Sequence, residues 1–111
     1  MGLRRGDIVT VALQGDFGKP RPAVVVESDA LPPTDHVLVC LGTSHLVADA
    51  EPRRVLVMPD AENGLRLPTQ FQSDKVSPAR RDKCGGVIGR LDRNSLSDLT
   101  LQLGVLLGLA E

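Results

Sequence analysis

The chain of 111 residues is poor in aromatic side chains: it contains two phenylalanines, Phe17 and Phe71, and neither tryptophan nor tyrosine. Its core must therefore be aliphatic. Proteins that bind single-stranded nucleic acids usually stack the bases on several aromatic rings. A broad stacking platform of that kind is excluded here.

The chain is also poor in metal-binding and disulfide-forming residues. Cys40 and Cys84 form no Cys-x-x-Cys pair, and two isolated cysteines make neither a disulfide framework nor a zinc site. His36 and His45 are nine positions apart and have no supporting ligands in sequence. We therefore expect no metal site and no cofactor.

Long apolar runs and an excess of charge of one sign are both missing. No apolar stretch approaches the ~18 residues that a transmembrane helix needs, and the N-terminus passes from Arg4-Arg5-Gly6 into an alternating strand without a signal-peptide core. These features predict a cytoplasmic protein without membrane contact. A net charge of −1 argues against a non-specific nucleic-acid coat protein but allows a local basic patch.

What the sequence does contain is typical of one globular domain over residues 1–111, with 41% hydrophobic and 24% charged residues. Short β-branched runs separated by Gly and Pro predict strands at 7–13, 22–27, 36–41, 54–58, 69–76 and 86–91. A helix capped by Asp92 or Ser95 follows, with a leucine stripe that we expect to be core (Leu96, Leu99, Leu103, Leu106 and Leu107). The pattern predicts a mainly β fold, a small antiparallel barrel closed by a C-terminal helix.

The strand expected at 69–76 is too polar for a core strand, so one of its faces should meet solvent or a ligand. Gln70, Gln72 and Asp74 share that face. We expect Pro78 to end the strand and residues 80–84 to form a short helical turn.

Arg21 stands between Pro20 and Pro22 at the start of an apolar strand. Each proline fixes its own φ and restricts the residue before it, so the arginine side chain leaves from a stiff backbone. Its guanidinium stays charged and presents a planar fork of donors to phosphate or carboxylate. For an isolated Pro-Arg-Pro, a solvated surface arginine remains the default interpretation.

Thr43 strengthens the case for Arg21 as a site residue. If the strands at 22–27 and 36–41 pair antiparallel, the start of the first lies beside the end of the second, and the two side chains share one rim of the barrel. Asp16 lies in the preceding loop. A fixed cation, a hydroxyl and a carboxylate suit an anionic transition state such as a phosphorane. A Ser-His nucleophile pair is not evident, because Ser44 and His45 are neighbours on a strand.

Several motifs in order resemble one family along the whole chain. They are Arg5-Gly6-Asp7-Ile8-Val9, Gly15-Asp16-Phe17-Gly18-Lys19-Pro20-Arg21-Pro22-Ala23-Val24-Val25-Val26, Leu41-Gly42-Thr43-Ser44, Ala61-Glu62-Asn63-Gly64-Leu65-Arg66, Asp74-Lys75-Val76, Val87-Ile88-Gly89-Arg90-Leu91 and the closing Leu107-Gly108-Leu109. In this order they look like a toxin of the MazF/PemK type.

The resemblance implies an SH3-like barrel (CcdB/PemK-like) that forms a homodimer, cleaves single-stranded RNA at specific sequences without a metal ion, and is neutralised by a MazE-like antitoxin. In relatives, the residues that match Arg21 and Thr43 carry catalysis, and the attacking group is the RNA's own 2′-hydroxyl. DNA, which lacks that group, is then no substrate.

Other matched positions are implied to contact the RNA. Asp16 and Asp74 match acidic positions with a catalytic or RNA-binding role, although the arginine that accompanies the second in some relatives is replaced here by Gln72. Further RNA-contact candidates are Phe17, Lys19, Ser44, Gln70, Gln72 and Lys75. A solvated strand face is the alternative for 70–74.

Two other functions stay open on sequence. A gyrase-poisoning toxin of the CcdB kind shares the fold and performs no chemistry, but it works through an aromatic C-terminal anchor, whereas this sequence closes on Leu-Ala-Glu. A degenerate barrel that only binds an antitoxin is the third possibility.

Overall fold

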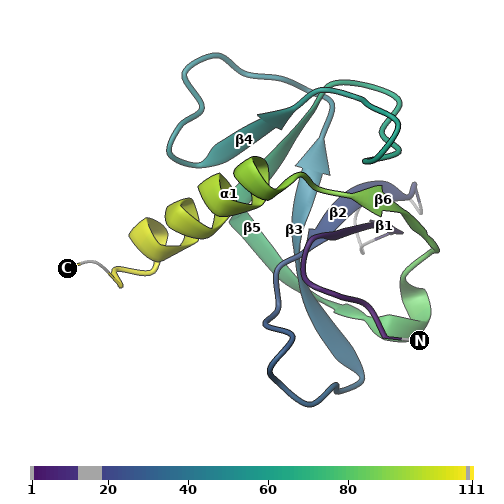
Figure 1. The fold of residues 1–111 in the computed structure, drawn as a ribbon. Coiled ribbons are helices and arrows are strands. Elements are labelled where there is room, and N and C mark those ends of the chain that lie inside the picture. Colours follow the sequence, from purple (N-terminus) through teal and green to yellow (C-terminus); the bar gives the residue numbers. More distant parts are fainter. Residues whose placement is uncertain (1, 13–18, 110) are drawn as a thin grey trace.

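The computed structural model describes residues 2–12, 19–109 and 111, which form one antiparallel sheet and a C-terminal helix (Figure 1). The elements are β1 (Asp7–Val11), β2 (Arg21–Val25), β3 (His36–Thr43), β4 (Arg54–Val57), β5 (Thr69–Arg80), a 3₁₀ turn (Arg81–Lys83), β6 (Val87–Arg90) and α1 (Arg93–Leu106). The six strands lie in the order β4-β5-β3-β2-β1-β6. The predicted fold class is confirmed, with the sheet curled into a half-barrel.

The two edge strands, β4 and β6, do not pair with each other. The segment at 59–68, which follows β4, crosses between them. The backbone N–H of Arg90 on β6 donates to the carbonyl of Glu62 at 2.9 Å. This segment therefore connects the two open edges of the half-barrel.

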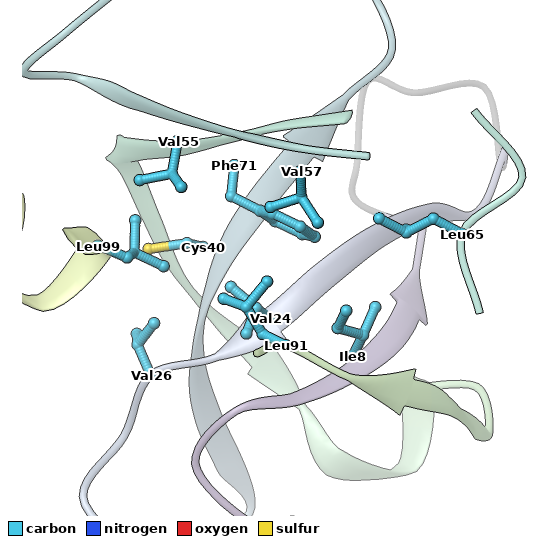
Figure 2. Packing of buried hydrophobic residues seen from close by; sticks show 10 residues of the cluster. All are labelled: Ile8, Val24, Val26, Cys40, Val55, Val57, Leu65, Phe71, Leu91 and Leu99. Carbon is cyan, nitrogen blue, oxygen red and sulfur yellow. The ribbon is translucent and has the colours of Figure 1, made fainter. Parts of the chain in front are cut away.

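Both faces of the sheet are covered, because successive side chains of a strand point to opposite sides. The main core lies on the inner face, where Phe71 sits among Val24, Val55, Val57 and other aliphatic side chains (Figure 2). A second cluster covers the opposite face (Val9, Val11, Ala23, Val25, Val37, Val39 and Ala79). The prediction that the second strand is buried on both faces is confirmed.

Cys40 belongs to the main core and is fully buried. Burial raises the pKa of its thiol to about 12, because the thiolate would lose its hydration. Cys40 thus acts as a small apolar core residue.

β5 differs from its prediction, because it continues through Pro78 to Arg80. β4 pairs only with the first part of β5, from Thr69 to Gln72, so the later part has β3 as its one neighbour in the sheet. A proline is tolerated on such an edge, since the missing N–H removes no bond to a second strand. The short helical turn after the strand is confirmed as the 3₁₀ turn.

Helix α1 begins at an Asp92 cap, whose Oδ2 accepts a hydrogen bond from the Ser95 N–H at 3.0 Å. Hydrogen bonding to the Ser95 side chain first, and to its backbone N–H second, lowers the pKa of the Asp92 carboxyl. Gln102 fixes the helix to the edge strand, because its Nε2 donates to the Arg54 carbonyl at 2.9 Å. None of the helices in the described ranges is long and apolar enough to cross a membrane.

The leucine stripe of α1 is core only in part. Leu99 is fully buried, and Leu96 and Leu103 pack against the main core. Leu107 follows the last helical turn and is 71% exposed, so its assignment to the core was wrong. The three-to-four spacing continues past the point where the helix still covers the sheet.

Candidate functional site

A pocket of about 540 Å³ opens at one end of the half-barrel. The ends of β1, β2 and β3 form one side of it, and the 59–68 segment and β6 form the other. Its described lining residues are Thr10, Pro20, Arg21, Pro22, Gly42, Ser44, Gly64, Leu65, Arg66, Leu67, Thr69 and Ile88. The volume is in the range of small-ligand sites.

Two guanidiniums give this pocket its charge. Arg21 comes from β2 and Arg66 from the opposite segment, and no acidic side chain lines the pocket within residues 2–12 and 19–109. Thr10 and Ser44 add hydroxyl groups to the wall. Among the described residues, the pocket therefore combines two cations with hydroxyl and apolar groups.

The pairing of β2 with β3 brings Arg21 and Thr43 to the same end of the sheet. The strands are antiparallel, with Ala23 opposite Leu41. Arg21, at the start of β2, and Thr43, at the end of β3, therefore lie at the same end of the sheet. The predicted antiparallel pairing is therefore confirmed.

Thr43 itself does not line the pocket, whereas its neighbours Gly42 and Ser44 do. Thr43 is half-buried, and its Oγ1 accepts a hydrogen bond from the His45 N–H at 3.1 Å. With the amide bound to its oxygen, the hydroxyl retains its hydrogen for donation to another acceptor.

Gln70 is buried, in contrast to the expected solvent- or ligand-facing position. Its Oε1 accepts from Arg54 Nη1 at 2.8 Å and from the Val47 N–H at 3.1 Å, and its Nε2 donates to the Val47 carbonyl at 2.9 Å. The expectation of an open face is wrong at this position, because the 45–53 loop folds over it. As placed here, the Gln70 amide holds that loop.

The other predicted contact residues lie outside the pocket lining or at its rim. Gln72 is half-buried, Asp74 and Lys75 are exposed, and none of the three lines the pocket. Lys19 and Ser44 are exposed, with Ser44 in the lining. Asp16 and Phe17 lie outside the described residues.

Arg66 and Thr10 line the pocket although no sequence motif predicted them there. Arg66 stood in the motif Ala61–Arg66, whose Asn63-Gly64 pair signals only a turn. Nothing in the spacing links that turn to Arg21. Among the described residues, no group of three or more His, Cys, Asp or Glu side chains is placed to hold a metal ion.

Comparison with known proteins identifies the family. Residues 4–107 match the model of the PemK-like, MazF-like toxins of type II toxin-antitoxin systems. The chain belongs to this family. A probable endoribonuclease MazF of Mycolicibacterium smegmatis is 33% identical over 109 residues, which are 97% of this chain and 99% of that protein.

Solved structures with a similar fold include an endoribonuclease and a MazF toxin. An endoribonuclease in complex with its cognate antitoxin, from a mycobacterial species, has a TM-score of 0.80 at 19% identity and covers 97% of each chain. The Mycobacterium tuberculosis toxin MazF-mt6 has a TM-score of 0.74 at 24% identity, over 92% of this chain and 96% of that one. At these identities the similarity establishes the MazF fold.

Proposed function

We propose that this MazF-family chain is a metal-independent, sequence-specific endoribonuclease that cleaves single-stranded RNA. The observation that supports it best is the pocket with Arg21 and Arg66 and no described acidic lining residue. The 33% identical relative, named a probable endoribonuclease, supports the same activity.

In the proposed reaction, the 2′-hydroxyl oxygen attacks the adjacent phosphorus. The O2′–P bond forms and the P–O5′ bond breaks, which leaves a 2′,3′-cyclic phosphate and a 5′-hydroxyl. One proton leaves O2′ and one is gained by O5′, so no redox partner or external nucleophile is needed. Arg21 stabilises the charge that builds on the phosphoryl oxygens. Thr43 donates its hydroxyl hydrogen to one of those oxygens.

The test is incubation of the purified chain with a long single-stranded RNA in excess EDTA. We expect discrete cuts whose products end in a cyclic phosphate and begin with a 5′-hydroxyl. The matched control is the same RNA with 2′-deoxy sugar at the cut nucleotide, which cannot react because its nucleophile is missing. No cleavage of RNA by the folded protein, or equal cleavage of the deoxy control, would reject the proposal.

We also propose that an antitoxin with an acidic tail binds this pocket, because guanidiniums that accept phosphates also accept carboxylates. Added to the cleavage assay, an acidic tail peptide from the cognate antitoxin should raise KM for RNA without lowering kcat. A neutral peptide in which Gln and Asn replace the acidic residues is the control. Simultaneous binding of RNA and the acidic peptide would contradict the shared site.

We also propose that the chain forms a homodimer, because several apolar residues of its C-terminal region are exposed. Leu101, Val105 and Leu109 recur every four residues and are 68%, 58% and 77% exposed. Leu101 and Val105 lie one turn apart on α1, and Leu109 lies in the turn that follows the helix. Exposed apolar residues gathered in this way are typical of a surface that another protein covers. Sedimentation analysis of the pure chain measures whether that protein is a second copy.

A further inference from the structure

The 59–66 segment is held in a fixed shape by two side chains. Asp60 Oδ1 accepts from the N–H groups of Glu62 at 2.8 Å and Asn63 at 2.7 Å. Asn63 is 2% exposed; its Oδ1 accepts from the Asp60 and Leu65 N–H groups, and its Nδ2 donates to the Met58 carbonyl. Both polar atoms of the Asn63 side chain are therefore used within residues 58–65.

The same segment is pressed against β6 without room for a side chain between them. Gly64 has φ +70°, and a Cβ there would lie 2.0 Å from the Ile88 carbonyl oxygen. A Cβ on Gly89 would lie 2.3 Å from the backbone carbon of Asn63. Only glycine fits either position. Leu65 then enters the main core, so the backbone that leads into Arg66 is anchored.

Arg66 follows this anchored residue and is itself exposed. It makes no hydrogen bond or ion pair with the residues that the structure describes, yet it lines the pocket opposite β2. An arginine held at a fixed point loses less conformational entropy when it binds an anion than one on a flexible loop. The segment thus acts as a rigid base for a charge that none of the described residues pairs with.

The pocket has room for more than one phosphate group. Apolar residues (Leu65, Leu67 and Ile88) lie on the side of Arg66, and Arg21 lies at the start of β2 on the other side. A nucleotide has this arrangement of chemical groups: a base and sugar between two successive phosphates. The two cations therefore suit two different phosphates of one RNA strand.

We propose that Arg66 binds an RNA phosphate next to the scissile one and so positions the strand for cleavage at Arg21. This inference rests on the proposed endoribonuclease activity. Because the flanking phosphate does not gain charge in the reaction, Arg66 contributes equally to binding of the substrate and of the transition state. Its loss should therefore raise KM and leave kcat nearly unchanged.

The test compares Arg66→Ala, Arg66→Lys and Arg93→Ala with the unmodified chain. Arg93 is the matched control, because it is an exposed arginine outside the pocket lining. We expect KM to rise about tenfold in Arg66→Ala, because one charge-assisted contact is lost. The kcat of this variant should stay within about threefold of the unmodified chain's. Arg66→Lys should recover most of the affinity, since a point charge suffices for a flanking phosphate, and Arg93→Ala should match the unmodified chain.

Salt dependence gives a second readout that a structural role would not change. Binding is measured with RNA carrying a 2′-deoxy sugar at the cut nucleotide. Loss of one phosphate contact should reduce the slope of log K against log salt by about 0.7 in Arg66→Ala and by nothing in Arg66→Lys or Arg93→Ala.

Each remaining outcome rejects the inference in a distinguishable way. An unchanged KM and slope in Arg66→Ala, with the unmodified chain active, rejects the role of Arg66 alone. A fall in kcat at constant KM places Arg66 on the scissile phosphate instead. An unmodified chain that neither binds nor cuts RNA rejects the proposed function, and this inference with it.

Discussion

Arg21→Ala should slow RNA cleavage by roughly 10²- to 10³-fold, the loss measured when one preorganised donor to a transition-state oxyanion is removed. Arg21 is the charged pocket residue at the start of β2, and Thr43, at the end of β3, lies at the same end of the sheet. The charge on the phosphoryl oxygens increases during the reaction, so the loss should appear in kcat. Single-turnover cleavage of a defined RNA measures it.

Arg21→Lys is the informative companion variant. Lysine keeps the positive charge but lacks the planar fork that can hold two oxygens at once. We expect an intermediate rate, closer to that of Arg21→Ala. Because Arg21 is exposed, the denaturation midpoint should stay within the usual range for surface substitutions. Cleavage by Arg21→Ala at the unmodified rate would refute the mechanism.

Phe71→Ala should lower the free energy of unfolding by about 3–5 kcal/mol, the cost of a large cavity in a packed core. Phe71 is fully buried and has the largest side chain of the main core cluster (Figure 2). Small neighbouring side chains such as Val55 and Val57 cannot fill the space of an aromatic ring. Urea unfolding with an unchanged m-value measures the loss.

Phe71 also lies directly beneath the pocket, so its loss should reach the site. A Cβ on Gly42, a pocket residue, would stand 3.0 Å from the Phe71 ring. Phe71→Leu is the control, since it fills more of the cavity and should lose clearly less stability than the alanine variant. Equal stability of Phe71→Ala and the unmodified chain would show that Phe71 is not the centre of the core.

The sequence predicted those elements whose pattern reflects burial on the sheet. The strands at β2 and β3 were recognisable because both faces are covered, which leaves nearly continuous apolar runs. The prediction that Pro78 ends its strand was wrong, because a proline breaks a strand only where a second strand lies beside it. No local sequence pattern shows whether such a neighbour is present. The prediction that Leu107 belongs to the core was wrong, because the three-to-four spacing of the leucines continues beyond the last residue of the helix.

The pocket was predictable only on the side of β2 and β3. Arg21 and Thr43 come from consecutive strands, so antiparallel pairing alone brings them to the same end of the sheet. Arg66 reaches the pocket through a segment that crosses from β4 to β6, a path that depends on the packing of Gly64 and Gly89. Gln70 could not be read as buried, because a loop from elsewhere in the chain covers it.

The bond between Gln102 and the Arg54 carbonyl has a consequence for the protein in a crowded cell. β4 is an edge strand, and an uncovered edge can recruit a strand from another molecule and start aggregation. By binding a main-chain acceptor of that edge, the helix side chain removes one of the groups that an incoming strand would need. The C-terminal helix thus hinders the addition of a foreign strand to the β4 edge, besides covering the core.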